Sequence, residues 1–154
     1  MFKILEEKLG YKRYLSLWHT KVEFPNGKII DWDSVGSGAK PPHFVVIFPY
    51  NTKTQKVTLI KEYNQGINDM RFTLPSGGFD KHPTILDCAI SELNEEACLK
   101  DGAFIRLLEE GHLGIPELKW GRNRFIPFLC LDSVTDGNPH ERDAEGIFNL
   151  IRIH

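Results

Sequence analysis

Residues 74–99, LPSGGFDKHPTILDCAISELNEEACL, decide the fold. They begin with a turn that contains two adjacent glycines and continue into a stretch whose apolar residues recur at helical spacing, namely Leu86, Ala89, Ile90, Leu93 and Ala97. Thr84, with Asp87 three residues further on, resembles a capping box in which Asp takes the acidic position. The pattern predicts one amphipathic helix from Thr84 to about Leu99, with its apolar face toward a core.

Three glutamates, Glu92, Glu95 and Glu96, stand at positions i, i+3 and i+4 of this helix and therefore share one face. Their like charges repel unless solvent or a cation compensates them, and converging carboxylate oxygens suit a hard cation such as Mg²⁺ or Mn²⁺. By itself, such a triplet more often marks a solvated acidic surface. Gly77 and Gly78 favour a metal site, because they let a backbone turn approach the acidic face closely.

Strand signals flank the helix on both sides. Residues 25–27, Pro-Asn-Gly, form a turn between two alternating stretches and predict an N-terminal β-hairpin. The strand candidates are Tyr14–Phe24 and Lys28–Trp32 in the hairpin, then Phe44–Phe48, Val57–Tyr63, Arg71–Leu74, Phe104–Leu108, Arg124–Leu131 and Gly146–Ile153. Many strands and one long helix predict the α+β class, with a mixed β-sheet packed against the helix.

Composition limits the class of protein. A chain of 154 residues that is 41% hydrophobic and 26% charged fits one globular domain. The net charge of −2 gives no general attraction to polyanions, so we expect no nucleic-acid partner. Three cysteines without CxxC or Cys/His ligand spacing argue against disulfides and a structural zinc site. There is no signal-peptide pattern and no run long enough to span a membrane, so we expect a cytoplasmic protein without a membrane partner.

The segment that decides the fold resembles the signature of the Nudix hydrolase family, G-x5-E-x7-R-E-U-x-E-E-x-G-U, where U is a bulky aliphatic residue. With the first glycine placed on Gly77, the core of the signature falls without gaps on residues 91–99, SELNEEACL. The matching positions are Gly77, Glu92, Leu93, Glu95, Glu96 and Leu99. The box is degenerate at three positions, since Pro83, Ser91 and Cys98 replace the first glutamate, the arginine and the second glycine.

The resemblance implies a single Nudix domain over residues 1–154, with N-terminal strands and a hairpin in residues 1–40 and the Nudix core in residues 41–154. It implies a pyrophosphohydrolase that acts on acid anhydrides in phosphorus-containing compounds and uses Mg²⁺, or Mn²⁺, as cofactor. In the family, the equivalents of Glu92 and Glu96 are the principal metal ligands. Glu95 is then a further ligand or the base, and the carbonyl of Ser76 completes the coordination sphere.

Segments outside the box resemble the branch of the family that cleaves ADP-ribose and ADP-sugars. Residues 24–27, FPNG, resemble its early PxG turn, and residues 57–65 and 71–77 resemble the strands that lead to its glycine turn. The resemblance implies a small nucleoside diphosphate linked to another moiety as substrate. The loop at residues 111–124 matches no segment of this branch.

The same branch implies further site residues. Its catalytic base commonly comes from an acidic loop late in the chain, which makes Glu141 and Glu145 candidates here, and a solvated turn is the alternative for both. Aromatic side chains of the N-terminal strands and of a partner subunit hold the adenine, so Trp32 and Tyr63 are candidates for stacking, with core packing as the alternative. Arg71 is a candidate for binding a phosphate. We also expect the chain to end without the usual C-terminal helix, so that a partner covers the exposed sheet face, which favours a homodimer.

The three departures from the signature support a second hypothesis. Losing the arginine and the early glutamate removes one positive and one negative charge from the surroundings of the metal ligands, and such losses lower metal affinity or activity about 10- to 100-fold. The alternative is therefore a catalytically impaired Nudix domain that binds a nucleotide ligand or serves a structural role.

Overall fold

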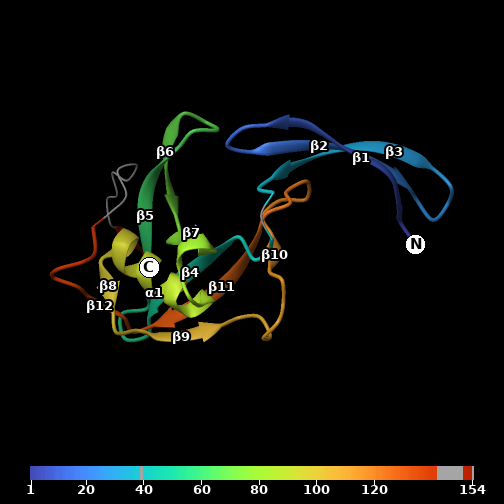
Figure 1. The fold of residues 1–154 in the computed structure, drawn as a ribbon. Coiled ribbons are helices and arrows are strands. Elements are labelled where there is room, and N and C mark those ends of the chain that lie inside the picture. The colour runs from blue at the N-terminus through green and yellow to red at the C-terminus, as the bar shows by residue number, and fades with distance from the viewer. Residues whose placement is uncertain (39, 142–150, 154) are drawn as a thin grey trace.

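An antiparallel sheet forms the N-terminal part of the chain, in the order β1 (Lys3–Lys12), β2 (Ser16–Glu23) and β3 (Ile29–Gly36). The computed structural model describes residues 1–38, 40–141 and 151–153. Figure 1 shows the N-terminal sheet as a long ribbon that projects from one side of the remaining structure. The predicted hairpin of β2 and β3 is confirmed, and its turn contains Gly27 with a φ of +80°, a conformation that favours glycine.

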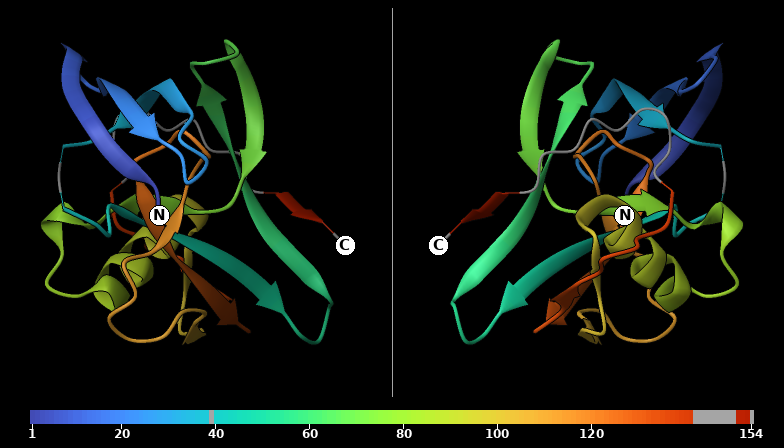
Figure 2. Two further views of the ribbon diagram at one scale, coloured as in Figure 1. Left: turned by 90° about the vertical axis from the view of Figure 1, so that its right-hand side faces the viewer. Right: turned by 90° about the vertical axis from the view of Figure 1, so that its left-hand side faces the viewer.

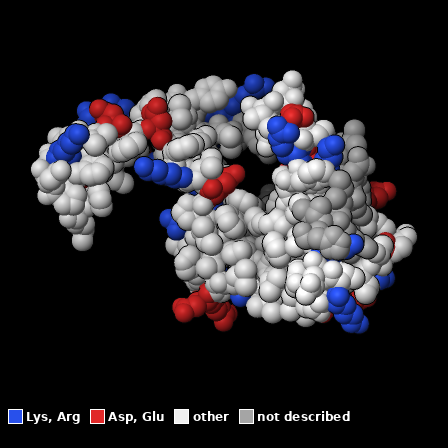
Figure 3. Space-filling view, turned by 180° about the vertical axis from the view of Figure 1, so that it is seen from behind, with Lys and Arg blue, Asp and Glu red and all other residues white. Residues whose placement is uncertain are grey.

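The first strand, β1, was not predicted from the sequence. All of its residues are exposed, and two register shifts interrupt its pairing with β2. A strand with no buried face lacks the alternating pattern from which strands are predicted, so the pairing with β2 defines it. In the space-filling view the N-terminal sheet is an arm that extends well beyond the body of the molecule (Figure 3).

The larger sheet has eight strands and supports the core. Its central order is β10 (Ile115–Pro116), β11 (Arg124–Leu131), β4 (Phe44–Asn51), β5 (Lys56–Asn64) and β13 (Ile151–Ile153). At its sides, β6 (Asp69–Thr73) pairs with β5, β7 (Ser76–Gly78) with β4, and β9 (Ala103–Arg106) with β11. Because β4 and β11 are parallel and the other pairs are antiparallel, the predicted mixed sheet is confirmed.

Two short strands lie outside the larger sheet. A small sheet pairs β8 (Leu99–Lys100) with β12 (Val134–Thr135), directly after the helix. The predicted strand Gly146–Ile153 is described only from Ile151, where β13 begins, since residues 142–150 lie outside the described part.

The predicted helix is confirmed as α1 (Ile85–Ala97), which follows a short 3₁₀ helix, η1 (Phe79–Lys81). Thr84 caps its N-terminus by accepting a 3.1 Å hydrogen bond from the backbone N–H of Asp87. Its C-cap, Cys98, adopts the left-handed conformation, with φ 50° and ψ 42°, at the position where the signature has glycine.

The core lies between α1 and the larger sheet, and the side views show the helix beside the strands of that sheet (Figure 2). The helix buries a stripe of small and aliphatic residues, Cys88, Ala89, Leu93 and Ala97, against Val45, Ile47, Ile60, Ile126, Phe128 and Cys130 of the strands. The prediction that Leu86 and Ile90 belong to this face was wrong, since their side chains are 44% and 46% exposed. Ile85 and Cys88 contribute to the core at this end of the helix instead, so the buried face is rotated away from the predicted one.

The loop at residues 111–124 joins the two sheets. The N–H of Val35 in β3 donates to the carbonyl of Trp120 at 3.0 Å, and the N–H of Arg122 donates to the carbonyl of Val35 at 2.8 Å. These hydrogen bonds fix the end of β3 to the core. Among the described residues, no helix has the length and hydropathy of a membrane-spanning segment.

Candidate metal and catalytic site

The carboxylate of Glu92 lies directly against the backbone of Gly77. A Cβ atom added to Gly77 would lie 1.9 Å from Cδ of Glu92 and 2.0 and 2.2 Å from its two oxygens. No side chain at position 77 is compatible with this contact. Helix α1 and strand β7 bring the carboxylate of Glu92 and the backbone of position 77 together, and only glycine leaves room for this contact.

Glu96, one turn further along α1, contacts the same glycine turn. Its Oε2 accepts a 2.7 Å hydrogen bond from the backbone N–H of Ser76. Since β7 is itself paired with β4, the turn is held rigidly in front of the helix. The structure therefore brings Glu92 and Glu96 to the same glycine turn. Ser76 contacts Glu96 through its backbone N–H group.

The electrostatics of this cluster are unfavourable without a cation. The pKa of Glu96 is raised from 4.5 to about 8, chiefly by burial and also by the negative charges of neighbouring carboxylates, while the hydrogen bond from Ser76 opposes the rise. Those carboxylates are Glu92, Glu62 and Glu95. Glu62, on β5, is a member of the cluster that sequence reasoning missed. Its register partner across the β5–β6 ladder is Arg71, so the two side chains leave the same face of that ladder.

Glu95 faces the late part of the chain. Its Oε1 accepts a 2.5 Å hydrogen bond from the hydroxyl of Ser91 and lies 3.9 Å from Nδ1 of His140. Asn94, buried in α1, holds this segment in place, because its side chain donates to Asp136 at 2.9 Å and accepts from the N–H of His140 at 2.8 Å. The helix thereby fixes the start of the predicted acidic loop.

Of the two predicted bases, Glu141 directly follows this anchored segment and is exposed. Glu145 lies outside the described residues. The role of either residue stays a prediction.

Residues 39–151, more than half of the chain, match the family of the NUDIX domain. The chain belongs to the Nudix family. A comparison with curated proteins found no match. Among solved structures, the crystal structure of an ADP compounds hydrolase is similar over 98% of this chain and 77% of its own, with a TM-score of 0.71 and 17% identity, which shows a shared fold.

Membership of the Nudix family confirms the predicted fold and, with it, the predicted class of enzyme, a Nudix pyrophosphohydrolase. Nudix hydrolases generally use divalent metal ions and act on small nucleotide substrates. The glycine turn and the glutamates of α1 offer carboxylate oxygens, the type of ligand that such an ion prefers.

The three predicted substrate-binding residues are exposed side chains of the two sheets, and one of them, Arg71, is the register partner of Glu62. Trp32, on β3, is 46% exposed, and the ammonium group of Lys119 lies 5.8 Å from the centre of its ring. Tyr63, at the end of β5, is 49% exposed and donates from its hydroxyl to Asn68. Core packing, the alternative for both aromatics, is therefore wrong. Arg71 is exposed and forms a 2.7 Å ion pair with Asp69.

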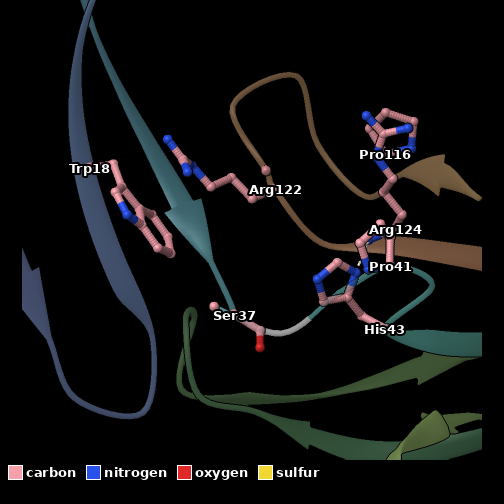
Figure 4. A pocket seen from close by; sticks show the side chains of 9 residues that line it. Trp18, Ser37, Pro41, His43, Pro116, Arg122 and Arg124 are labelled. Atoms are coloured by element: carbon pink, nitrogen blue, oxygen red, sulfur yellow. Dashed lines mark hydrogen bonds between the residues drawn. The ribbon is translucent and has the colours of Figure 1, made fainter. Parts of the chain in front are cut away.

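A pocket that the sequence did not predict lies where the N-terminal sheet of this Nudix chain meets its core (Figure 4). Its volume of about 580 Å³ is in the range of small-molecule sites, and none of its lining residues belongs to α1. The guanidinium of Arg122 stacks on Trp18, 4.0 Å from the ring centre, and donates to Ser34. Arg124 and His43 line the opposite side. The cationic lining suits an anionic group.

Proposed function

We propose that this chain hydrolyses the diphosphate bond of a nucleoside diphosphate linked to another moiety, with Mg²⁺ as cofactor and ADP-ribose or an ADP-sugar as the expected substrate. The observation that carries the proposal is the contact of two carboxylates, Glu92 and Glu96, with one glycine turn. A solvated acidic surface does not require a glycine beneath a carboxylate, nor does it raise the pKa of a glutamate to about 8.

The donor set fits a hard divalent cation. Carboxylate oxygens are the ligands that Mg²⁺ and Mn²⁺ prefer, and a cation relieves the repulsion among the glutamates. We assign Glu92, Glu95, Glu96 and the carbonyl of Ser76 as its ligands. When bound, the ion neutralises charge on the diphosphate and lowers the pKa of the attacking water.

We propose that a carboxylate on the side of α1 that faces residues 136–141 accepts the proton from that water. Glu95 receives hydrogen bonding from Ser91 and lies near His140, which supports a role in orienting water or accepting its proton. Glu141 is the next candidate in the described chain, and Glu145 is the other. A carboxylate in this position needs only hydrogen-bond reach to the water.

For substrate binding we propose Arg71 as a phosphate ligand and Trp32 and Tyr63 as surfaces on which the base stacks. Arginine binds phosphate oxygens in a bidentate manner, and exposed aromatic rings offer flat apolar area. Within one chain, the two rings belong to different sheets. A homodimer, in which the N-terminal sheet of one subunit approaches the core of the other, is the assembly we propose.

The dimer proposal is supported by exposed apolar side chains on β1, among them Ile4 at 63%, Leu9 at 52% and Tyr11 at 57%. Sedimentation analysis of the purified chain tests it. A dimer that dissociates on introducing Leu9→Lys supports the proposal, whereas a monomer at every accessible concentration contradicts it. We further propose that residues 1–154 act as one Nudix unit, divided at about residue 40, and that it works in the cytoplasm.

The activity is tested by incubating the purified chain with Mg²⁺ and a panel of ADP-ribose, ADP-sugars and other nucleoside diphosphate derivatives, followed by detection of nucleoside monophosphate. We expect metal-dependent release of AMP that Glu92→Gln reduces at least about 100-fold, since it removes a proposed ligand. Glu110→Gln, which changes an exposed glutamate in a loop, is the matched control. Thermal stabilisation by a nucleotide without product supports the impaired binding domain instead, and neither signal supports a structural role.

A further inference from the structure

We propose that His82, Cys88 and Glu92 form a second metal site, selective for Zn²⁺ and similar borderline ions, at the start of α1. Each residue offers one ligand atom, an imidazole nitrogen, a thiol sulfur and a carboxylate oxygen, and these atoms all lie within 4.8 Å of one another. The ligand atoms of a tetrahedral zinc site are about 3.5 Å apart, given bonds of about 2.0–2.3 Å. Side-chain rotations that move the ligand atoms by about 1 Å bring them to the separation of a tetrahedral zinc site.

The fold around the glycine turn explains why the three residues meet. Cys88 and Glu92 are four residues apart in α1 and therefore lie on one face of the helix. His82 is the C-cap of η1, and its N–H donates to the carbonyl of Phe79 at 3.4 Å. The 3₁₀ turn folds His82 back over the first turns of the helix.

Backbone oxygens surround the thiol as well. The carbonyl oxygen of Gly78 lies 3.4 Å from Sγ of Cys88, and that of Gly77 lies 3.8 Å away. The thiol donates to both oxygens, and a metal ion that binds the sulfur takes the place of the thiol proton. The absence of CxxC and Cys/His ligand spacing in the sequence argued against a structural zinc site. Spacing patterns find only ligands that share one local motif, whereas here a loop and a helix supply the ligands.

The donor types decide which ion binds. A thiolate, an imidazole and one carboxylate match Zn²⁺, with water as the fourth ligand, whereas Mg²⁺ prefers oxygen ligands alone. The glutamate cluster and this site therefore differ in selectivity although both use residues of α1. Glu92 belongs to both, so an ion held by His82 and Cys88 withdraws a carboxylate from the proposed Mg²⁺ site. Zn²⁺ is then an inhibitor of the hydrolase, a consequence that rests on the proposed function.

Binding is tested without reference to activity by adding Co²⁺ to the full chain under reducing, Mg²⁺-free conditions and recording the absorption spectrum. A thiolate ligand gives Co²⁺ an intense charge-transfer band in the near ultraviolet. We expect this band in the wild type, its loss in Cys88→Ser and its retention in Cys98→Ser, the matched control at the other end of α1. His82→Ala, a change in a partly exposed residue, serves as the second variant in case Cys88→Ser does not fold, and it weakens Co²⁺ binding.

Absence of the band in the wild type, or its loss in Cys98→Ser but not in Cys88→Ser, overturns the site. The inhibitory role is tested separately, by titrating Zn²⁺ into the Mg²⁺-dependent reaction and normalising each variant to its own rate without Zn²⁺. We expect His82→Ala to need at least about tenfold more Zn²⁺ for half inhibition. Removing a residue that only supports a metal ligand already lowers metal affinity about 10- to 100-fold, and here a ligand itself is removed. Equal sensitivity of both proteins overturns the inhibitory role, and a chain that binds Co²⁺ through Cys88 but hydrolyses nothing contradicts only the proposed function.

Discussion

Replacing Glu96 with glutamine tests the electrostatic account of the glutamate cluster most directly. In the folded chain the pKa of Glu96 is raised from 4.5 to about 8, first by burial and then by the neighbouring carboxylates. Between these two values the folded state holds a proton that the unfolded chain has released. The free energy of unfolding therefore falls as the pH rises from about 4.5 to about 8, and it stays level above that.

The magnitude follows from the pKa difference. At 1.36 kcal/mol for each pH unit, a rise from 4.5 to about 8 corresponds to at most about 5 kcal/mol of lost stability at alkaline pH. The amide of Glu96→Gln keeps an oxygen that accepts from the N–H of Ser76 but carries no charge at any pH. The variant is thus expected to match the metal-free wild type near pH 5 and to exceed it by several kcal/mol near pH 8.5.

Urea unfolding of both proteins in the presence of a chelator, from pH 5 to pH 9, measures this difference. Glu110→Gln, in an exposed loop, corrects for the general effect of removing a carboxylate. Adding Mg²⁺ at pH 8.5 is expected to stabilise the wild type much more than Glu96→Gln, because only the wild type keeps the ligand. If the unfolding free energies of the wild type and of Glu96→Gln change in parallel across the whole pH range, the pKa of Glu96 is not raised and the reasoning is refuted.

Three further substitutions test single contacts. Gly77→Ala places a Cβ 1.9 Å from Glu92 and is expected to lower the rate of hydrolysis at least about 100-fold. The unfolding free energy is expected to change little, because the displaced group is the end of a flexible side chain. Gly137→Ala, with nothing within 4 Å of the new atom, is the control, and equal rates for both variants contradict the contact. Thr84→Ala removes the helix cap and is expected to cost about 1 kcal/mol in urea unfolding, with no cost if the cap contributes nothing. Cys98→Gly relieves the left-handed conformation at φ 50° and is expected to stabilise by about 1 kcal/mol, whereas a loss of stability means that side-chain contacts of the cysteine matter more.

Local patterns predicted the elements that carry their own signal. The helix was predicted from its apolar spacing and from Thr84, and the hairpin from its Pro-Asn-Gly turn, because both patterns are complete within a few residues. The side that α1 turns to the core was predicted only in part. Leu86 and Ile90 are exposed while Ile85 and Cys88 pack in the core, and the spacing of apolar residues alone does not decide between two overlapping faces of the helix.

Contacts between distant segments account for what was missed. Glu62 joins the cluster through the pairing of β5, and the pocket beside Arg122 forms only when the loop at residues 111–124 reaches β3. Neither has a spacing pattern in the sequence. His82 and Cys88 are close in the chain, but the turn of η1 that brings them together is not a recognised ligand motif.

Position 91 shows how this chain supports its glutamates without the arginine of the family signature. In the gap-free alignment Ser91 takes that place, and its hydroxyl donates a 2.5 Å hydrogen bond to Glu95. A serine orients one carboxylate but adds no positive charge. The pKa of Glu96, raised by burial and then by the repulsion of neighbouring carboxylates, is therefore left for a bound ion to lower. Ser91→Arg, facing Glu95 on the same helix, is therefore expected to lower the pKa of Glu96 and to stabilise the metal-free chain at alkaline pH. The same substitution is expected to leave less stabilisation for Mg²⁺ to provide, because the arginine has already relieved part of the repulsion.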